Sequence, residues 1–211
     1  MAGLTRARTR AYWHNAGQKG RHALLKFGTL SRSILLLAAL WLSPGTASAQ
    51  LLDAPPLIDA AERGNLLDVE KALLTGASVN IRGKNRYTPL MLAAGQGAVD
   101  IVDLLLARGA IVDLVEDEGN TALVHAALNN HDEVIALLLA AGAAINRSNK
   151  QGDTALMRAA EKGSENAVVA LLAAGADPTL TNFAGRPAFD RAMENRRNGV
   201  TAIFRKAGID R

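Results

Sequence analysis

The segment TPLMLAAGQGAVDIVDLLLARG, residues 88–109, contains the features that decide the fold. Thr88 can accept a hydrogen bond from the first turn of a helix that follows it. Apolar residues then recur at helical spacing as far as Gly97, where the chain can turn through a conformation that glycine tolerates best. The nearly all-apolar residues 99–106 predict a second helix that is buried on both sides. Gly109 ends this second helix, so the segment indicates a helix hairpin.

The same hairpin recurs along the chain with a period of 33 residues. A fixed period of this length indicates stacked copies of one small unit, each contacting mainly its neighbours. About ten residues, many of them polar, connect the last glycine of one unit to the threonine of the next, and we call this segment a finger. Such a stack points function toward an extended surface rather than a catalytic pocket. The glycines that keep the period are Gly76, Gly109, Gly142, Gly175 and Gly208.

Thr88-Pro89-Leu90-Met91-Leu92-Ala93-Ala94 resembles the T-P-L-H-x-A-A signature of the ankyrin-repeat family. The resemblance covers about residues 54–211 and implies an all-α solenoid of stacked helix-turn-helix units with hairpin-like fingers. We count about five units including the caps, at about 54–86, 87–119, 120–152, 153–185 and 186–211. The family's histidine is absent from every copy, so the hydrogen bonds that it makes in the family are not expected here. The residues at its place are Ile58, Met91, Val124, Met157 and Asp190.

Residues 1–49 differ in composition from the repeats that follow. They hold seven basic residues and no acidic one, then an apolar run at 34–42, then Ala47-Ser48-Ala49. This order predicts a secretory signal peptide whose removal leaves Gln50 as the first residue. The apolar run is far shorter than the ~20 residues needed to span a bilayer. We therefore expect residues 50–211 to be a periplasmic or secreted domain that is not bound to a membrane. A membrane-anchored scaffold with an uncleaved leader is the alternative.

Removal of the leader reverses the sign of the net charge. The whole chain has 24 basic and 20 acidic residues, a formal net charge of +4. Seven of the basic residues lie in the leader, which leaves 17 basic against 20 acidic residues, a net charge of −3. The basic balance thus belongs to the leader, and nucleic-acid binding loses its compositional support. The absence of cysteine excludes disulfides and thiolate metal sites.

The mature sequence contains no recognisable catalytic constellation. Its two histidines, His125 and His131, are expected to be structural, because a two-histidine site lacks the further ligands that a metal normally needs. There is no G-x-S-x-G motif and no glycine-rich phosphate loop. The acidic finger at residues 116–118 lacks the spaced ligands of a calcium loop. We predict a non-enzymatic protein with no cofactor and no metal. An enzyme built on His125 or on the acidic finger is the alternative.

The resemblance also implies where a partner would bind. In ankyrin proteins, partners usually contact the fingers and the exposed side of the first helices. Tyr87 and Phe183 are favoured because exposed aromatic residues are enriched in binding hot spots, although each could instead pack against its own hairpin. Charged fingers could orient a partner or serve solubility alone. The predicted contact residues are Lys84, Asn85, Tyr87, Gln96, Asp117, Glu118, Asn120, Asn129, Lys150, Gln151, Asp153, Lys162, Phe183 and Arg186.

One finger breaks the repeat pattern at its turn. Arg86 stands where the later fingers have Gly119, Gly152 and Gly185, positions that we expect at positive φ. Arginine in that conformation costs about 1 kcal/mol unless a neighbouring residue takes over the turn. We therefore predict that Arg86→Gly stabilises the fold.

The predicted function is protein binding. We expect a monomeric, non-enzymatic adaptor, helper or protector of another protein in the periplasm, with a preformed surface that costs little ordering entropy on binding. An immunity or inhibitor protein that blocks a toxin or a secreted enzyme is the alternative.

Overall fold

The computed structural model describes residues 55–210 of the 211-residue chain. The predicted leader and its cleavage point at Ala49 and Gln50 lie outside the described residues. Within them, ten α-helices and one short 3-10 helix follow one another, and the only pairing of β type is an isolated bridge between Thr181 and Pro187. The expected all-α class is confirmed. The helices are α1 (Pro56–Glu62), α2 (Leu66–Leu74), α3 (Pro89–Gln96), α4 (Val99–Ala107), α5 (Ala122–Leu128), α6 (Asp132–Ala140), α7 (Ala155–Lys162), α8 (Glu165–Ala173), α9 (Ala188–Glu194) and α10 (Asn198–Lys206), and the 3-10 helix is η1 (Lys84–Arg86).

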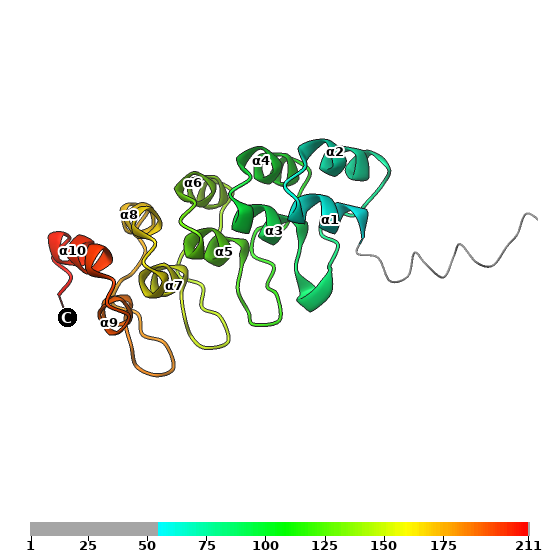
Figure 1. Cartoon of the computed structure of the whole chain (residues 1–211). Helices are drawn as coiled ribbons and strands as arrows, with labels where there is room; N and C mark the ends of the chain where they lie inside the picture. The colour runs from blue at the N-terminus through cyan, green and yellow to red at the C-terminus, as the bar shows by residue number, and fades with distance from the viewer. Residues whose placement is uncertain (1–54, 211) are drawn as a thin grey trace, which may run out of the picture. The chain divides into compact units, whose positions relative to one another are not determined.

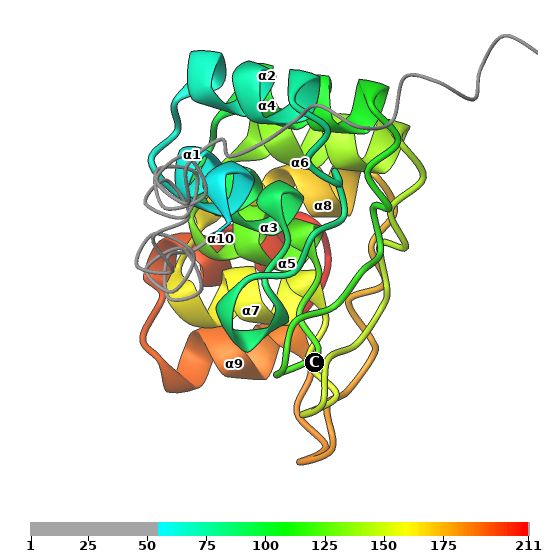
Figure 2. The ribbon, with the colours of Figure 1, turned by 90° about the vertical axis from the view of Figure 1, so that its right-hand side faces the viewer.

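The helices of this repeat domain form two layers (Figure 1). The odd-numbered helices α1 to α9 are the first helices of each unit, and each packs on the next odd-numbered helix. The even-numbered helices α2 to α10 form the second layer, each against the first helix of its own unit. The fingers project together from one side of the first helices (Figure 2). This is the solenoid that the period of the sequence predicts.

The ends of the first helices follow from local backbone chemistry. Thr88 caps α3, because its side chain accepts a hydrogen bond from the backbone N–H of Met91 at 3.3 Å. Thr154 caps α7 in the same way, whereas Thr121 precedes α5 without such a bond. Gly97 ends α3 with φ of +71°, in the left-handed region that favours glycine. The predicted hairpin turn is therefore present.

Small residues and methionine fill the core between the first helices. Met91 and Met157, which stand at the place of the family's histidine, are each 1% exposed. Burying such a side chain contributes about 1.5–3 kcal/mol, so apolar packing replaces the hydrogen bonds that histidine would make. The alanine pairs of α3, α5 and α7 are fully buried and let these helices approach closely.

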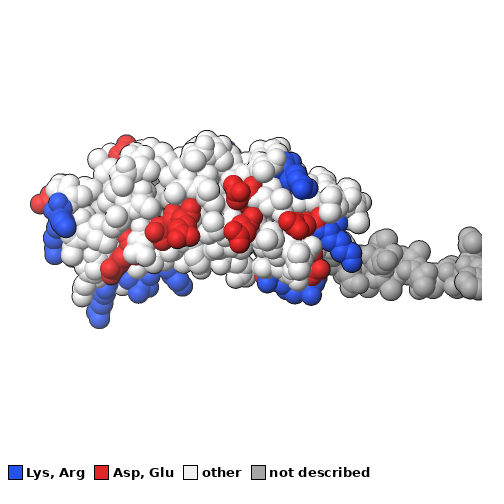
Figure 3. All heavy atoms as spheres, turned by 90° about the horizontal axis from the view of Figure 1, so that it is seen from above, with Lys and Arg blue, Asp and Glu red and all other residues white. Residues whose placement is uncertain are grey.

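The second helices have one exposed face. Residues Asp100 and Asp103 of α4 are exposed, and only Ile101, Val102 and Leu105 of that helix are buried. The prediction that second helices are buried on both sides is therefore wrong for the outer face, because no element of residues 55–210 covers it. Acidic side chains form a band across this face (Figure 3). Exposed acidic residues of the second helices include Asp68, Asp100, Asp103, Asp132, Glu133 and Glu165.

Candidate protein-binding face

The fingers lie beside the layer of odd-numbered helices along the whole stack (Figure 2). We call the fingers and the exposed side of these helices the first-helix face. Each finger leads directly into the N-terminus of an odd-numbered helix. The N-terminal ends of these helices therefore lie beside the fingers, and their C-terminal ends lie away from them. The fourteen residues predicted to contact a partner belong to the fingers and the first helices that build this face, although not all of them are exposed.

The finger tips are held together by a ladder of backbone hydrogen bonds. One N–H in each of the last three fingers donates to a carbonyl oxygen of the preceding finger, and the donors are 33 residues apart. The ladder fixes the tips relative to one another, so their side chains start from a rigid backbone. The bonds run from Asp117 to Asn85 (3.1 Å), from Lys150 to Glu118 (3.0 Å) and from Phe183 to Gln151 (3.1 Å).

In each of these fingers, a buried side chain accepts hydrogen bonds from backbone N–H groups of the turn. Glu116 is 4% exposed, and its carboxylate accepts hydrogen bonds from the backbone N–H groups of Glu118 and Asn120 at 2.7 and 2.8 Å. Asn149 and Asn182 stand at the same position in the next two fingers and accept equivalent bonds. Glu116 is thus part of the turn, although the sequence groups it with two exposed acidic neighbours.

Two predicted contact residues join neighbouring fingers through their side chains. Asn120 accepts a hydrogen bond from Asn149 Nδ2 at 2.8 Å, and Asp153 accepts one from Asn182 Nδ2 at 2.8 Å. Asp153 is 3% exposed, so its carboxylate belongs to the interior of the stack. Asp153 lies at the end of its finger, directly before the cap of α7.

A network of charged side chains crosses the first-helix face between α7 and α9. Glu161 Oε2 lies 2.5 Å from both Arg158 Nη1 and Arg191 Nη2. Asp153 Oδ2 lies 3.3 Å from Arg191 Nη2 and 3.8 Å from Arg158 Nη1. The network thus contains two negative and two positive charges, so its net charge is zero. It extends from the end of the finger to the last turn of α7. Arg158, Glu161 and Arg191 were missed among the predicted contacts.

His125, Arg158 and Arg191 form a row on the first helices, each 33 residues from the next. That spacing was visible in the sequence and could have identified the row. Each of the three has a buried side-chain nitrogen with no hydrogen-bond partner in the described residues: His125 Nε2, Arg158 Nε and Arg191 Nε. A buried polar group without a hydrogen-bond partner costs free energy.

His125 is held neutral by its surroundings. Burial lowers the pKa of His125 below its usual 6.5, nearby Arg158 lowers the pKa further, and Glu116 partly offsets both. The Tyr87 ring lies 5.2 Å from the His125 ring, centroid to centroid, at an interplanar angle of 44°. Burial also raises the pKa of the Tyr87 hydroxyl, as does Glu116.

The two favoured aromatic residues differ in exposure. Tyr87 is half-buried, and its ring packs against His125 of the next unit. Phe183 is 82% exposed at the tip of the last finger, where its backbone N–H donates to Gln151. Phe183 therefore offers the larger open apolar surface to a partner.

His131 has a structural role at the start of α6. Its ring lies against Gly97, where any side chain would collide with it, and its Nε2 lies 3.2 Å from the Gly95 carbonyl oxygen. The residues one and two periods later make the same kind of bond to the preceding first helix. These bonds join Ser164 Oγ to the Leu128 carbonyl at 3.0 Å and Arg197 Nε to the Glu161 carbonyl at 2.9 Å.

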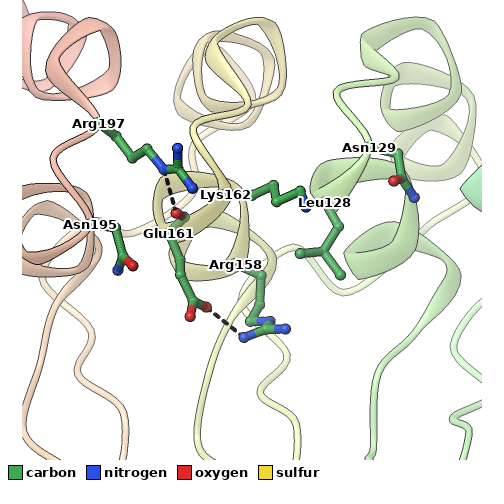
Figure 4. Close-up of a pocket in the computed structure, with 7 residues that line it drawn as sticks. All are labelled: Leu128, Asn129, Arg158, Glu161, Lys162, Asn195 and Arg197. Carbon is green, nitrogen blue, oxygen red and sulfur yellow. Dashed lines mark hydrogen bonds and ion pairs between the residues drawn. The ribbon is translucent and has the colours of Figure 1, made fainter.

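Two hollows open on this face. One, of about 480 Å³, lies beside the first finger and is lined by Ile58, Glu62, Lys84, Asn85, Tyr87 and Leu92. The other, of about 410 Å³, lies at the C-terminal ends of α5, α7 and α9 (Figure 4). We call this second hollow the recess. It is lined by Leu128, Asn129, Arg158, Glu161, Lys162, Asn195 and Arg197.

The predicted contact residues are therefore divided between surface and interior. The structure exposes Lys84, Asn85, Gln96, Asp117, Glu118, Asn129, Lys150, Gln151, Lys162, Phe183 and Arg186, partly buries Tyr87 and Asn120, and buries Asp153. Lys84, Asn85 and Tyr87 share the hollow beside the first finger, and Asn129 and Lys162 share the recess. That these residues contact a partner stays a prediction.

The described residues offer neither a metal site nor a membrane-spanning helix. No group of three or more His, Cys, Asp or Glu side chains there has the geometry to hold a metal ion. None of the helices in this part of the chain combines the length and apolar character needed to cross a membrane.

Comparison with protein families gave one match. The family model described as ankyrin repeats (3 copies) matches residues 57–149, 113–182 and 137–210. The matches together run through the whole stack of helices, which confirms the resemblance seen in the sequence. No curated protein matches the chain.

Proposed function

The chain belongs to the ankyrin-repeat family, and from that premise we propose that it is an exported adaptor, helper or protector that holds one envelope protein on its first-helix face. Repeats of this family indicate a protein–protein interaction module. Export is supported by the composition of residues 1–49, and a chain without cysteine needs no oxidative folding in that compartment.

The charge network across α7 and α9 is the observation that carries this proposal. Glu161 bridges Arg158 and Arg191 from adjacent first helices, and Asp153 holds them from the finger side. The arginines are therefore fixed before any partner arrives. A surface ordered in advance loses little side-chain entropy on binding, so more of the contact energy appears as affinity.

Export is tested by the intact mass of the protein recovered from the cell envelope. A mass that begins at Gln50 supports the proposal. A mass that retains residues 1–49 contradicts it and supports the membrane-anchored scaffold instead.

The binding surface is tested by photo-crosslinking in living cells. A photoreactive phenylalanine analogue is placed at Phe183 on the first-helix face or, as the matched control, at Asp103, which is exposed on the second-helix face. We expect one envelope protein to be captured from position 183 and not from position 103. Capture from position 103 alone would contradict the assigned surface.

The captured protein also separates the two functional classes. An adaptor or protector leaves the activity of its partner intact or raises it, whereas an immunity or inhibitor protein abolishes that activity. The first outcome is expected here, and the measurement is the activity of the partner with and without equimolar repeat protein.

A further inference from the structure

We propose that the recess at the ends of α5, α7 and α9 binds an acidic segment of the partner protein, with Lys162 and Arg197 as the cations that meet its carboxylates. This inference rests on the proposed function, because the segment belongs to the protein held on the first-helix face. It adds the chemistry that the partner must present there.

The charges around the recess do not balance. Arg158 is compensated by Glu161, which together with Asp153 also compensates Arg191. Lys162 and Arg197 line the same recess and form no ion pair with any of residues 55–210. The recess therefore presents two uncompensated positive charges on a domain with an acidic outer face.

The guanidinium group of Arg197 is held in place. Its Nε donates to the Glu161 carbonyl oxygen at 2.9 Å, and its stem lies over Gly163, where a Cβ would come within 2.9 Å of Arg197 Cδ. Its two Nη groups make no hydrogen bond within the described residues. An arginine that is anchored through Nε keeps its Nη–H groups free to donate to a carboxylate. The planar arrangement of these donors matches the two oxygens of a carboxylate. Figure 4 shows Arg197 reaching from the start of α10 toward α7, on which Lys162 lies.

The other walls of the recess fit a peptide better than a small inorganic anion. Asn129 and Asn195 each donate an amide hydrogen to a carbonyl of their own helix, at 3.1 and 2.9 Å. Their amide oxygens accept no hydrogen bond from the described residues and can accept one from the backbone N–H of a bound segment. Leu128 adds apolar surface for the methylene groups of a glutamate side chain. A small anion would use the cations alone.

The acidic band on the second helices disfavours a large polyanion. Any long negatively charged chain that extends beyond the recess meets the repulsion of this band and of the net charge of residues 50–211. A short acidic segment contacts only the recess. The expected occupant is therefore a protein segment with one or two Asp or Glu residues, rather than a nucleic acid.

The test is a selection from a random peptide library displayed on phage, against the protein recovered from the cell envelope and two charge-reversal variants, Lys162→Glu and Arg197→Glu. We expect peptides selected by the wild type to share an acidic position. Each reversal should weaken their binding by about tenfold, because an attraction becomes a repulsion. Arg205→Glu, at an exposed position of α10, is the matched control and should leave binding unchanged.

Two further measurements make the result specific. Arg197→Lys keeps the charge but loses the planar donors, so its binding should lie between those of the wild type and Arg197→Glu. Thermal unfolding of each variant must match the wild type, so that weaker binding reflects the recess. Selected peptides without acidic preference, equal loss in Arg205→Glu, or a DNA oligonucleotide that binds with the same sensitivity would each overturn the inference.

The outcome also separates this inference from the proposed function. If the protein captured from position 183 binds the double variant Lys162→Glu/Arg197→Glu as tightly as the wild type, the recess is not its site and the proposed function stands. If acidic peptides bind the recess but no envelope protein is captured, the proposed function fails and the anion-binding recess stands.

Discussion

Arg86→Gly should make this protein more stable, although it removes a long side chain. Asn85 and Arg86 have φ of +52° and +63°, whereas the later fingers place glycine at the position of Arg86. The left-handed conformation destabilises the folded state by about 1–2 kcal/mol for a non-glycine residue. Glycine avoids this cost but loses more backbone entropy on folding, which reduces the gain by about 0.5–1 kcal/mol. We therefore expect a net gain of about 1 kcal/mol in the free energy of unfolding.

No contact of the Arg86 side chain offsets this gain. The side chain is exposed and makes no hydrogen bond or ion pair within the described residues, and the bond from Arg82 Nη1 goes to the Arg86 backbone carbonyl, which glycine keeps. Urea unfolding at constant m value measures the change. For a domain of this size, about 1 kcal/mol corresponds to a rise of about 2–4 °C in Tm.

Asn130→Gly is the matched control. Asn130 has the same φ of +63°, but its Oδ1 accepts a hydrogen bond from the Ala167 N–H at 3.0 Å. Loss of that bond costs about 1 kcal/mol and cancels the relief of strain, so this variant should be no more stable than the wild type. An unchanged or lower stability of Arg86→Gly, or an equal gain in both variants, would refute the assignment of strain.

Three other substitutions should change stability in ways that urea unfolding can measure. Burial lowers the pKa of His125 below 6.5, so the unfolded state binds more protons and the wild type loses stability as pH falls through that value. His125→Leu should remove this pH dependence and add about 1 kcal/mol by deleting the unpartnered Nε2; a pH series checks both effects. Asp153→Asn should cost about 2–3 kcal/mol because it unbalances a buried ion pair, and a loss under 1 kcal/mol would count against that pairing. Gly175→Ala should cost about 1 kcal/mol, because φ there is +87° while the new Cβ meets nothing within 4 Å. Gly152→Ala should cost clearly more, because its Cβ would also come within 2.8 Å of the Phe183 backbone nitrogen in the next finger; equal losses would contradict this close approach.

Much of the backbone could be predicted because its causes are local. Thr88 as a cap, Gly97 as a helix end and Arg86 in a glycine-like turn all depend on which dihedral angles and hydrogen bonds one residue allows. The structure bears out each of these assignments. The repeat period extends them along the chain, because every unit uses nearly the same local signals.

The polar side chains of the candidate face were harder to predict because their partners lie about 30 or more residues away in sequence. In the sequence, Asp153 looks like one more charged finger residue. In the structure it is buried, in contact with Asn182 and Arg191. Tyr87 and Phe183 allow the same two interpretations from sequence. Only the packing of the next unit distinguishes the half-buried ring from the exposed one.

The amino-acid order by itself determined a stack of helix hairpins. The helical spacing of apolar residues and the backbone preferences of single residues define one hairpin, and the 33-residue period repeats it along the chain. The tertiary structure alone decided which charges are neutralised inside the stack and which, such as Lys162 and Arg197, still lack an opposite charge among residues 55–210. The physical reason is that burial and ion pairing depend on atoms brought together by neighbouring units, and a repeat pattern gives their order along the chain without their distances.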